Sequence, residues 1–515
     1  ISPMLTREYD AMSLNAPLFK RIQAVYAEKD VLGLNEQDAR LLELRHRSFV
    51  RSGAALEPAV KEQVAEINAE LSSLTTQFGQ NLLGATKAFK LKLTDEEQTA
   101  GLSGDFKASI WNEEEGAWVV GLNRSSYETF MTQSEVRGLR QQLFDGYRLR
   151  ATSGEFDNGP LLIRTAQLRA RRAELMGYES HAHYQLETRM AKTPQTAEDF
   201  LLRVWRPALA RAKEELADMQ AMVGDDFEVA GHDWWHYAEK VRKARYDLDE
   251  NETKPYFELE SVRNGVFEMA NRLFGLTFEP ADVQGWNPVV TSFDVKNADG
   301  EHLGLLMTDM YARDSKRGGA WMSSYRPASR IGDDDIRPIV TNNLNLSKPP
   351  PGQPTLMRFS EVETLFHEFG HGLHGLMTKV NYPLFAGTSG GPRDYIEFPS
   401  QLLEHWAAEP EMLALFGRHH ASGEVIPSEL VERMRVAANF NQGFKTTEYI
   451  AASLLDLRWH MLTSAEAAQL SDARVFEQEV LNEYGLIDEI EPRYRSQYFS
   501  HIFSGGYSAG YYAYL

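Results

Sequence analysis

Residues 363–375 read Glu-Thr-Leu-Phe-His-Glu-Phe-Gly-His-Gly-Leu-His-Gly and contain the pattern H-E-x-x-H at 367–371. The apolar spacing around this pattern, from about 361 to 379, predicts a helix. Because four residues make about one helical turn, His367 and His371 project from the same face, where both imidazoles can reach one cation. Glu368 points aside from that line, where a general base would hold a water molecule. This stretch therefore predicts a metal site on a helix.

The motif leaves one ligand to be found. A catalytic zinc ion has typically three protein ligands and one open position. His374 follows His367 by seven residues, roughly 10 Å along a helix axis, which is too far to share the ion, and we interpret it as a packing residue or a partner of the ligands. Gly370 costs about 1 kcal/mol relative to alanine inside a helix, so we expect another element to approach closely there.

A carboxylate from the following segment is the expected third ligand. Glu397 lies between two apolar residues in 393–401, and burying a carboxylate there is costly unless it is paired or binds a metal. We prefer Glu397, with Glu404 and Glu409 as weaker alternatives. The spacing from Asp394 to Glu397 also fits a reciprocal helix cap, and the residues alone leave the ligand and the cap about equal.

The rest of the chain predicts a mainly α fold. Apolar alternation, with a turn at 297–300, predicts a small β-sheet between Thr291 and Asn345, directly before the metal helix. A hairpin with an acidic turn is expected at 105–122. Helices are expected as one long amphipathic element from Leu56 to Leu82 and, with more interruptions, at 126–150, 161–176, 196–223, 400–417 and 427–465. Such lengths suit layers of packed helices.

Composition excludes several classes of protein. The 515 residues include 54 Lys+Arg and 74 Asp+Glu, a net charge of −20, which argues against nucleic-acid binding. No stretch approaches the ~18 apolar residues of a membrane span, so we expect a soluble protein. Zero cysteines exclude cysteine-ligated zinc and disulfides, so His, Asp and Glu must hold any metal. Without a clear linker, we expect one unit over 1–515, clipped at both ends.

The C-terminal stretch from His501 to Leu515 contains four tyrosines and three glycines. A tyrosine near a metal can donate a hydrogen bond to an oxyanion without adding charge to the resting site. Glycines would let this segment bend as a loop that closes on a substrate. The alternative is a buried stripe, because Tyr507, Tyr511 and Tyr514 keep helical spacing.

Taken together, the sequence resembles the thimet oligopeptidase and neurolysin family of zinc metallopeptidases, most closely its bacterial dipeptidyl carboxypeptidase branch. The likeness runs through essentially the whole chain and is densest at 311–322, 363–375, 387–401 and 492–514. It implies a zincin-type helical ellipsoid, with two lobes that flank a deep substrate channel and a zinc-binding core at about 291–515.

The resemblance also implies one Zn²⁺ per chain and hydrolysis of short peptides, with release of dipeptides from a free C-terminus. The residues concerned are His367, His371 and Glu397 as zinc ligands, Glu368 as general base, His501, Tyr507 and Tyr514 in catalysis, and Tyr507, Tyr511 and Arg393 in substrate binding. We expect a monomer in the cytoplasm that binds no membrane and no nucleic acid, although the incomplete N-terminus leaves the periplasm or secretion open.

Release of dipeptides requires a group that receives the free carboxylate of the substrate. Arg313, Lys316, Arg317 and Arg393 are the cations near the motifs, and we expect at least two of them to be ordinary surface or ion-paired groups. Glu363 and Arg393 are also candidates to orient the ligands, with a surface ion pair as an equal alternative.

Two other functions remain open at this point. The first is an endo-acting oligopeptidase with the same site. The second is a non-catalytic peptide-binding protein that holds zinc structurally or not at all, although a structural site needs four protein ligands and only three can be named.

Overall fold

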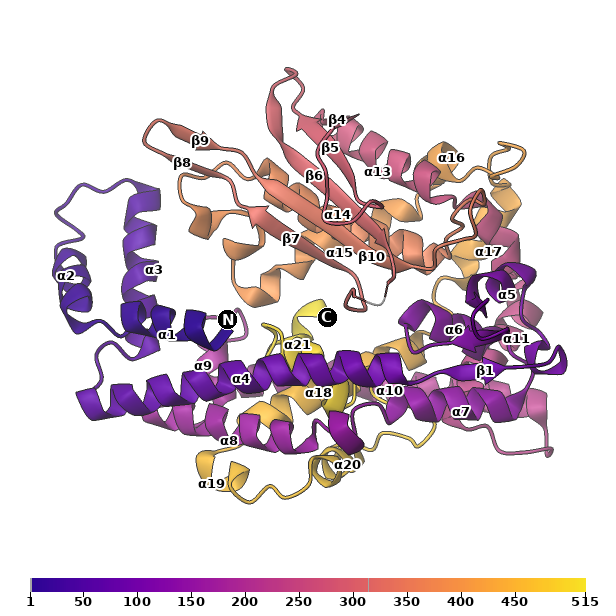
Figure 1. The fold of residues 1–515 in the computed structure, drawn as a ribbon, viewed down its shortest axis with the longest axis horizontal. Coiled ribbons are helices and arrows are strands. Elements are labelled where there is room, and N and C mark those ends of the chain that lie inside the picture. Colours follow the sequence, from indigo (N-terminus) through magenta and orange to yellow (C-terminus); the bar gives the residue numbers. More distant parts are fainter. Residues whose placement is uncertain (1, 314) are drawn as a thin grey trace.

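The computed structural model describes residues 2–313 and 315–515, and it places the H-E-x-x-H motif on α14 (Phe359–Met377), against a five-stranded sheet (Figure 1). The strand order is β4-β5-β6-β10-β7. β6 and β10 run parallel, and the other neighbouring strands run antiparallel. The strands are β4 (Thr277–Pro280), β5 (Thr291–Lys296), β6 (His302–Tyr311), β7 (Trp321–Arg326) and β10 (Ile339–Leu346).

One apolar core joins this sheet to the helices around it. Val340 of β10, Phe366 of α14 and Met269 of α13 (Leu259–Phe274) are buried in the same cluster. α14 begins directly after Arg358. The backbone N–H of Arg358 donates to the Glu361 carboxylate at 2.8 Å, and this hydrogen bond caps the start of the helix. The metal motif is therefore carried by a helix whose other face is fixed against the sheet.

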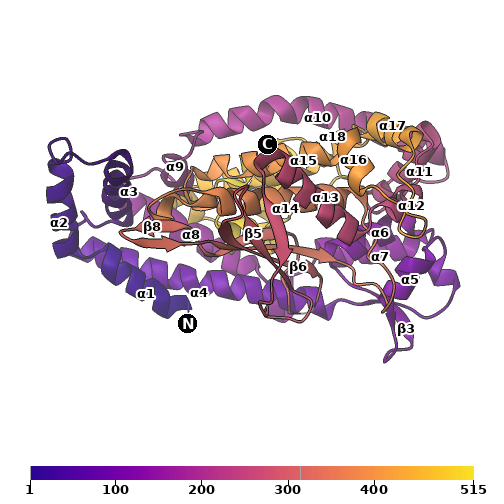
Figure 2. The same cartoon turned by 90° about the horizontal axis from the view of Figure 1, so that it is seen from above.

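A second group of helices lies below the sheet in Figure 1 and includes α4 (Pro58–Ala88), α8 (Gly159–Leu175), α10 (Pro194–Val223) and α18 (Gln442–Met461). α18 packs along α10, and its residue Trp459 shares a core with Phe78 of α4 and Phe503 of α21 (Ser500–Phe503). Figure 2 shows α4 and α10 along opposite sides of the molecule, and Figure 1 shows the C-terminal end of the chain between this group of helices and α15 (Glu397–Ala407). This position brings the tyrosine-rich segment beside the metal motif.

The other elements surround these two groups. The helices are α1 (Ser2–Ser13), α2 (Ala16–Ala27), α3 (Glu36–Ser52), α5 (Gly104–Ile110), α6 (Arg124–Gln133), α7 (Arg137–Arg148), α9 (His181–Leu186), α11 (Trp234–Tyr246), α12 (Glu250–Thr253), α16 (Pro410–Phe416), α17 (Ser428–Ala437), α19 (Ser464–Ala467) and α20 (Ala473–Glu483). The strands are β1 (Leu91–Leu93), β2 (Trp111–Asn112), β3 (Ala117–Val120), β8 (Ser329–Ile331) and β9 (Asp334–Ile336).

The mainly helical fold and the sheet before the metal helix are confirmed, but three predicted helices are broken. The segment 126–150 forms α6 and α7, and 400–417 forms α15 and α16, since Pro410 begins a new helix. The segment 427–465 forms α17, α18 and α19, with a break at Asn441, whose φ of 59° lies in the left-handed region. The apolar spacing is similar on both sides of each break, so periodicity alone predicted continuous helices.

The hairpin predicted at 105–122 is half wrong. Its first half is the helix α5, which begins where Ser103 accepts the backbone N–H of Phe106. Of the predicted first strand, only Trp111–Asn112 pairs with β3. The side-chain cap at Ser103 favours the helix, and the sequence pattern did not reveal it. Among the described residues, no helix is both long and apolar enough to span a bilayer.

Candidate metal centre

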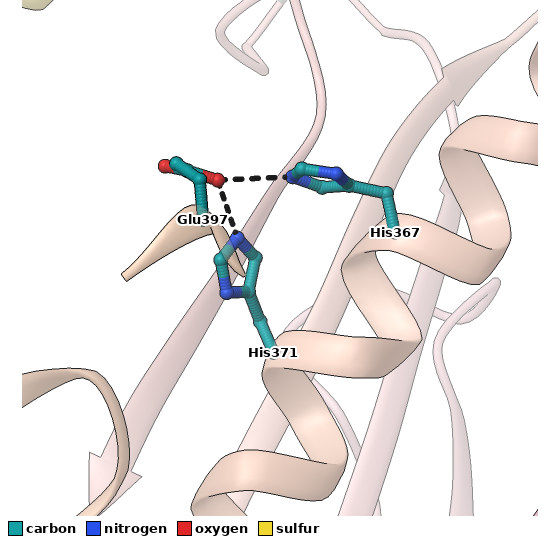
Figure 3. A group of neighbouring side chains, drawn as sticks. All are labelled: His367, His371 and Glu397. Carbon is teal, nitrogen blue, oxygen red and sulfur yellow. Dashed lines mark hydrogen bonds and ion pairs between the residues drawn. The ribbon is translucent and has the colours of Figure 1, made fainter. Parts of the chain in front are cut away.

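Three side chains from two neighbouring helices converge on one point (Figure 3). His367 and His371 lie one turn apart on α14, and Glu397 is the first residue of α15. The Oε2 atom of Glu397 lies 3.2 Å from Nε2 of His367 and 3.0 Å from Nε2 of His371. One ligand atom from each of the three residues lies within 4.8 Å of the others. Two imidazoles and a carboxylate form a donor set that suits zinc.

Gly370 allows the two helices to approach this closely. A Cβ atom at this position would lie only 2.7 Å from the Cα atom of Ser400 and 3.2 Å from the carbonyl oxygen of Pro399, both on α15. Glycine therefore lets the backbone of α15 pack directly on α14, which brings Glu397 to the two histidines. The close approach predicted from this glycine is confirmed.

Glu404 orients one of the two imidazoles. It lies two turns after Glu397 on α15, and its Oε1 atom is 2.5 Å from Nδ1 of His367, which leaves Nε2 of that ring facing Glu397. Burial alone would lower the pKa of His367, but hydrogen bonds to Glu397 and Glu404 outweigh it and raise the pKa to about 10. Burial opposes the charge on Glu397 as well, yet bonds from His367 and His371 hold its pKa well below the usual range.

Glu368 lies beside these ligands without joining them. Its side chain is buried, and among residues 2–313 and 315–515 its Oε2 atom has no hydrogen-bond partner. Burial raises the pKa of this carboxyl to about 8. The amide of Asn342 on β10 donates to the backbone carbonyl of Glu368 at 2.5 Å and so ties this turn of α14 to the sheet. When ionised, a buried carboxylate with one oxygen free of hydrogen bonds, next to a metal-ligand set, can accept a proton from a water molecule.

The other residues considered as ligands lie apart from this group. The three-residue cluster contains neither His374 nor Glu409, and Glu409 is an exposed residue at the start of α16. Asp394, which also fitted a reciprocal cap with Glu397, accepts instead the backbone N–H groups of Met190 and Ala191. Its carboxylate therefore ties the start of α15 to the chain before α10 rather than capping the helix.

The tyrosine segment reaches the same cluster. The hydroxyl of Tyr507 donates to Oε1 of Glu397, and the ring of Tyr514 stacks on that of Tyr507 at 5.4 Å between centroids. The guanidinium of Arg393 lies 4.0 Å from the centroid of the Tyr507 ring. Sequence reasoning placed these residues near the metal but did not identify the contact between Tyr507 and Glu397.

His501 packs beside Tyr507, and Tyr511 packs beside Tyr514. The ring of His501 is 6.1 Å from that of Tyr507, and burial, followed by the charge of Arg317, lowers its pKa to about 4, so the imidazole is neutral. Tyr511 is only 4% exposed, and its ring packs 4.8 Å from that of Phe499 in the core. The buried-stripe alternative therefore describes Tyr511, and its role in substrate binding stays a prediction.

Two of the four candidate cations are internal ion pairs, as expected. Arg313 donates to both carboxylate oxygens of Asp309 at 2.8 Å, and the buried Lys316 binds the same carboxylate at 3.1 Å. Arg317 lies over the ring of Trp321 at 4.9 Å. Arg317 and Arg393 remain as cations near the tyrosine segment. Glu363 is part-buried on α14, and its role as an orienting residue stays a prediction.

A sequence model of peptidase family M3 matches residues 130–515, which include every residue of this centre. The chain belongs to peptidase family M3. The dipeptidyl carboxypeptidase of Escherichia coli (strain K12) is 40% identical to this M3 peptidase over 514 residues, which are 98% of this chain and 75% of the relative. The oligopeptidase A of Salmonella typhimurium (strain LT2) is 34% identical over 498 residues, which are 94% of this chain and 73% of the relative. The expected family and the expected enzyme class, a metallopeptidase, are confirmed.

Proposed function

We propose that this M3 peptidase binds one zinc ion through His367, His371 and Glu397 and releases dipeptides from the free C-terminus of short peptides. The observation that carries the proposal is the convergence of these three side chains beside a buried carboxylate, Glu368, that has no partner among the described residues. The 40% identity to a relative named dipeptidyl carboxypeptidase supports the direction of cleavage.

When bound, zinc would acidify a water molecule and polarise the scissile carbonyl. Glu368 would accept a proton from the attacking water and pass it to the leaving amine, because its Oε2 atom has no hydrogen-bond partner among the described residues. The Tyr507 hydroxyl, which donates to Glu397 in this structure, would donate to the developing oxyanion. Tyr514 supports the Tyr507 ring by stacking, and His501 is a neutral neighbour that can exchange hydrogen bonds with the peptide.

Arg393 is the cation that we assign to the free carboxylate of the substrate. Its guanidinium lies over the ring of Tyr507, and among the described residues its buried Nε atom has no hydrogen-bond partner. Arg317 is the alternative, because its charge acts on the nearby His501. A guanidinium binds a carboxylate through two parallel hydrogen bonds, which would fix the end of the peptide.

The test compares one peptide of about ten residues with its C-terminus free and with its C-terminus amidated. Mass spectrometry should show successive dipeptides released from the free form. Amidation should cost about 1.5–3 kcal/mol, the scale of a charge-assisted hydrogen bond, or roughly ten- to hundredfold in kcat/KM. Removal of zinc with a chelator should abolish both reactions, and added zinc should restore them.

Equal cleavage of both peptides at internal bonds would instead establish an endo-acting oligopeptidase. The 34% identity to a relative named oligopeptidase A supports this second candidate. Peptide binding without cleavage by the zinc-loaded chain would establish the non-catalytic alternative. The monomeric state and the location in the cytoplasm stay predictions.

A further inference from the structure

A buried carboxylate on α18 holds the loop that carries Tyr507. Asp456 is fully buried, and its two carboxylate oxygens accept three successive backbone N–H groups, from Ala509 at 2.9 Å, Gly510 at 2.8 Å and Tyr511 at 2.9 Å. Consecutive backbone N–H groups that converge in this way form a binding site for an anion. Here the anion is a side chain of the same protein.

The same carboxylate is linked to the other end of the loop. His460 donates from Nδ1 to Oδ1 of Asp456 at 2.8 Å, and its Nε2 atom lies 2.7 Å from Nη1 of Arg169. That Nη1 group also donates to the backbone carbonyl of Ile502 at 2.8 Å. Burial lowers the pKa of His460, which favours the neutral ring that this chain of bonds requires. The network therefore connects Ile502 with residues 509–511, on both sides of Tyr507.

This loop needs an external anchor because its own backbone is irregular. Residues 504–510 belong to no helix or strand, and Ala509, which is fully buried, has a φ of 51°, in the left-handed region that residues with a Cβ rarely adopt. Buried N–H groups without an acceptor are unfavourable. The N–H of Gly510 also donates to the carbonyl of Tyr507 within the loop at 2.8 Å, whereas those of Ala509 and Tyr511 find their acceptor outside the loop. Asp456 is that acceptor.

We infer that Asp456 is a positioning residue of the proposed peptide site: it fixes the loop so that the Tyr507 hydroxyl reaches Glu397. Among the described residues it makes no hydrogen bond to the ligand cluster, and it acts through the backbone that carries Tyr507. The effect on catalysis rests on the proposed function, whereas the effect on the loop does not.

The first test is Asp456→Asn, with Asp472→Asn as a matched control. Asparagine keeps the shape but offers one acceptor oxygen instead of two, so at least one N–H group of the loop loses its partner. Asp472 also accepts two backbone N–H groups, from Arg474 and Val475, but at an exposed helix start. Hydrogen exchange in the peptides covering 504–515 should become roughly tenfold faster in the Asp456 variant only, with zinc content unchanged in both variants.

The second test measures catalysis in a double-mutant cycle with Tyr507→Phe. We expect Asp456→Asn to lower kcat roughly 10²-fold, the cost of a small misplacement in an active site, and to change KM less. In the Tyr507→Phe background the same substitution should have little further effect on kcat, because both act through one hydroxyl. A role in general stability alone would give additive losses.

Unchanged exchange and unchanged kcat in Asp456→Asn, or additive losses in the cycle, would overturn the inference. If Asp456→Asn does not fold, His460→Asn gives a milder test: its amide still donates to Asp456 but does not reach Arg169, and it should loosen the Ile502 end of the loop. If the zinc-loaded parent cleaves no peptide, the proposed function fails, and the exchange experiment still decides whether Asp456 holds the loop.

Discussion

Zinc affinity should separate the ligand carboxylate from the carboxylate that orients a ligand. The substitutions are Glu397→Gln and Glu404→Gln, which keep the size of each side chain and remove its charge. Glu397 is 1% exposed and contacts both histidines of the cluster, at 3.2 and 3.0 Å. The side chain of Glu404 is 37% exposed and contacts one of them, through the nitrogen that faces away from the cluster. We therefore expect the larger loss from Glu397→Gln.

The two losses can be estimated separately. Apparent zinc-binding free energies of about 10–16 kcal/mol, divided equally among four ligands, give about 2.5–4 kcal/mol for each. Loss of Glu397 should thus weaken zinc binding roughly 10²–10³-fold. Groups that orient a metal-bound histidine typically contribute about 10–100-fold. Because Glu404 is partly exposed, its loss should weaken zinc binding by an amount toward the lower end of that range. The zinc affinities of the two variants should therefore differ by about tenfold or more.

The assay is competition for zinc against a chelator of known affinity at pH 7.5, with metal content measured after dialysis. Glu409→Gln is the control, because Glu409 is an exposed carboxylate at the start of the next helix, and it should bind zinc like the parent. An equal or larger loss for Glu404→Gln than for Glu397→Gln would refute the assignment of Glu397 as the third ligand.

Three further predictions concern the base, the packing of the metal helix and the dependence of stability on pH. Glu368→Gln should retain zinc and lose at least roughly 10²–10⁴-fold in kcat in a peptide assay, and near-normal turnover would exclude it as the general base. Gly370→Ala should lower the melting temperature and weaken zinc binding despite its better helix propensity, since the added Cβ would lie 2.7 Å from the Cα atom of Ser400; a gain in stability would contradict the packing argument. Burial lowers the pKa of His236 to about 4 from an ordinary value near 6.5. Between pH 6.5 and 4 the unfolded chain therefore binds a proton that the folded chain does not. The free energy of unfolding should fall over this range by up to about 3 kcal/mol. In His236→Asn, the drop in unfolding free energy between pH 7 and pH 4.5, measured by urea unfolding, should be smaller by about 2.5 kcal/mol. An unchanged drop would refute the shift.

Several parts of the fold were predictable because they depend on geometry within one element. The long helix α4 and the strands β5, β6 and β10 follow from the spacing of apolar residues. The errors lie where a local hydrogen bond or a left-handed residue sets the start of a helix, as at Ser103 before α5 and Asn441 before α18. Such breaks leave the apolar spacing almost unchanged, so periodicity does not reveal them.

For the candidate metal centre, too, geometry within one helix was predictable and contacts between elements were not. The sequence by itself determined that His367 and His371 face one point and that Glu368 lies beside it, because a single helical turn sets these directions. Only the tertiary structure decided that Glu397 joins them, that Glu404 orients His367 and that Asp456 holds the loop of Tyr507. These contacts join residues between 26 and 55 positions apart, and the contact between Glu397 and Tyr507 joins residues 110 positions apart. The packing of whole helices across the chain sets such distances, and no local pattern encodes them.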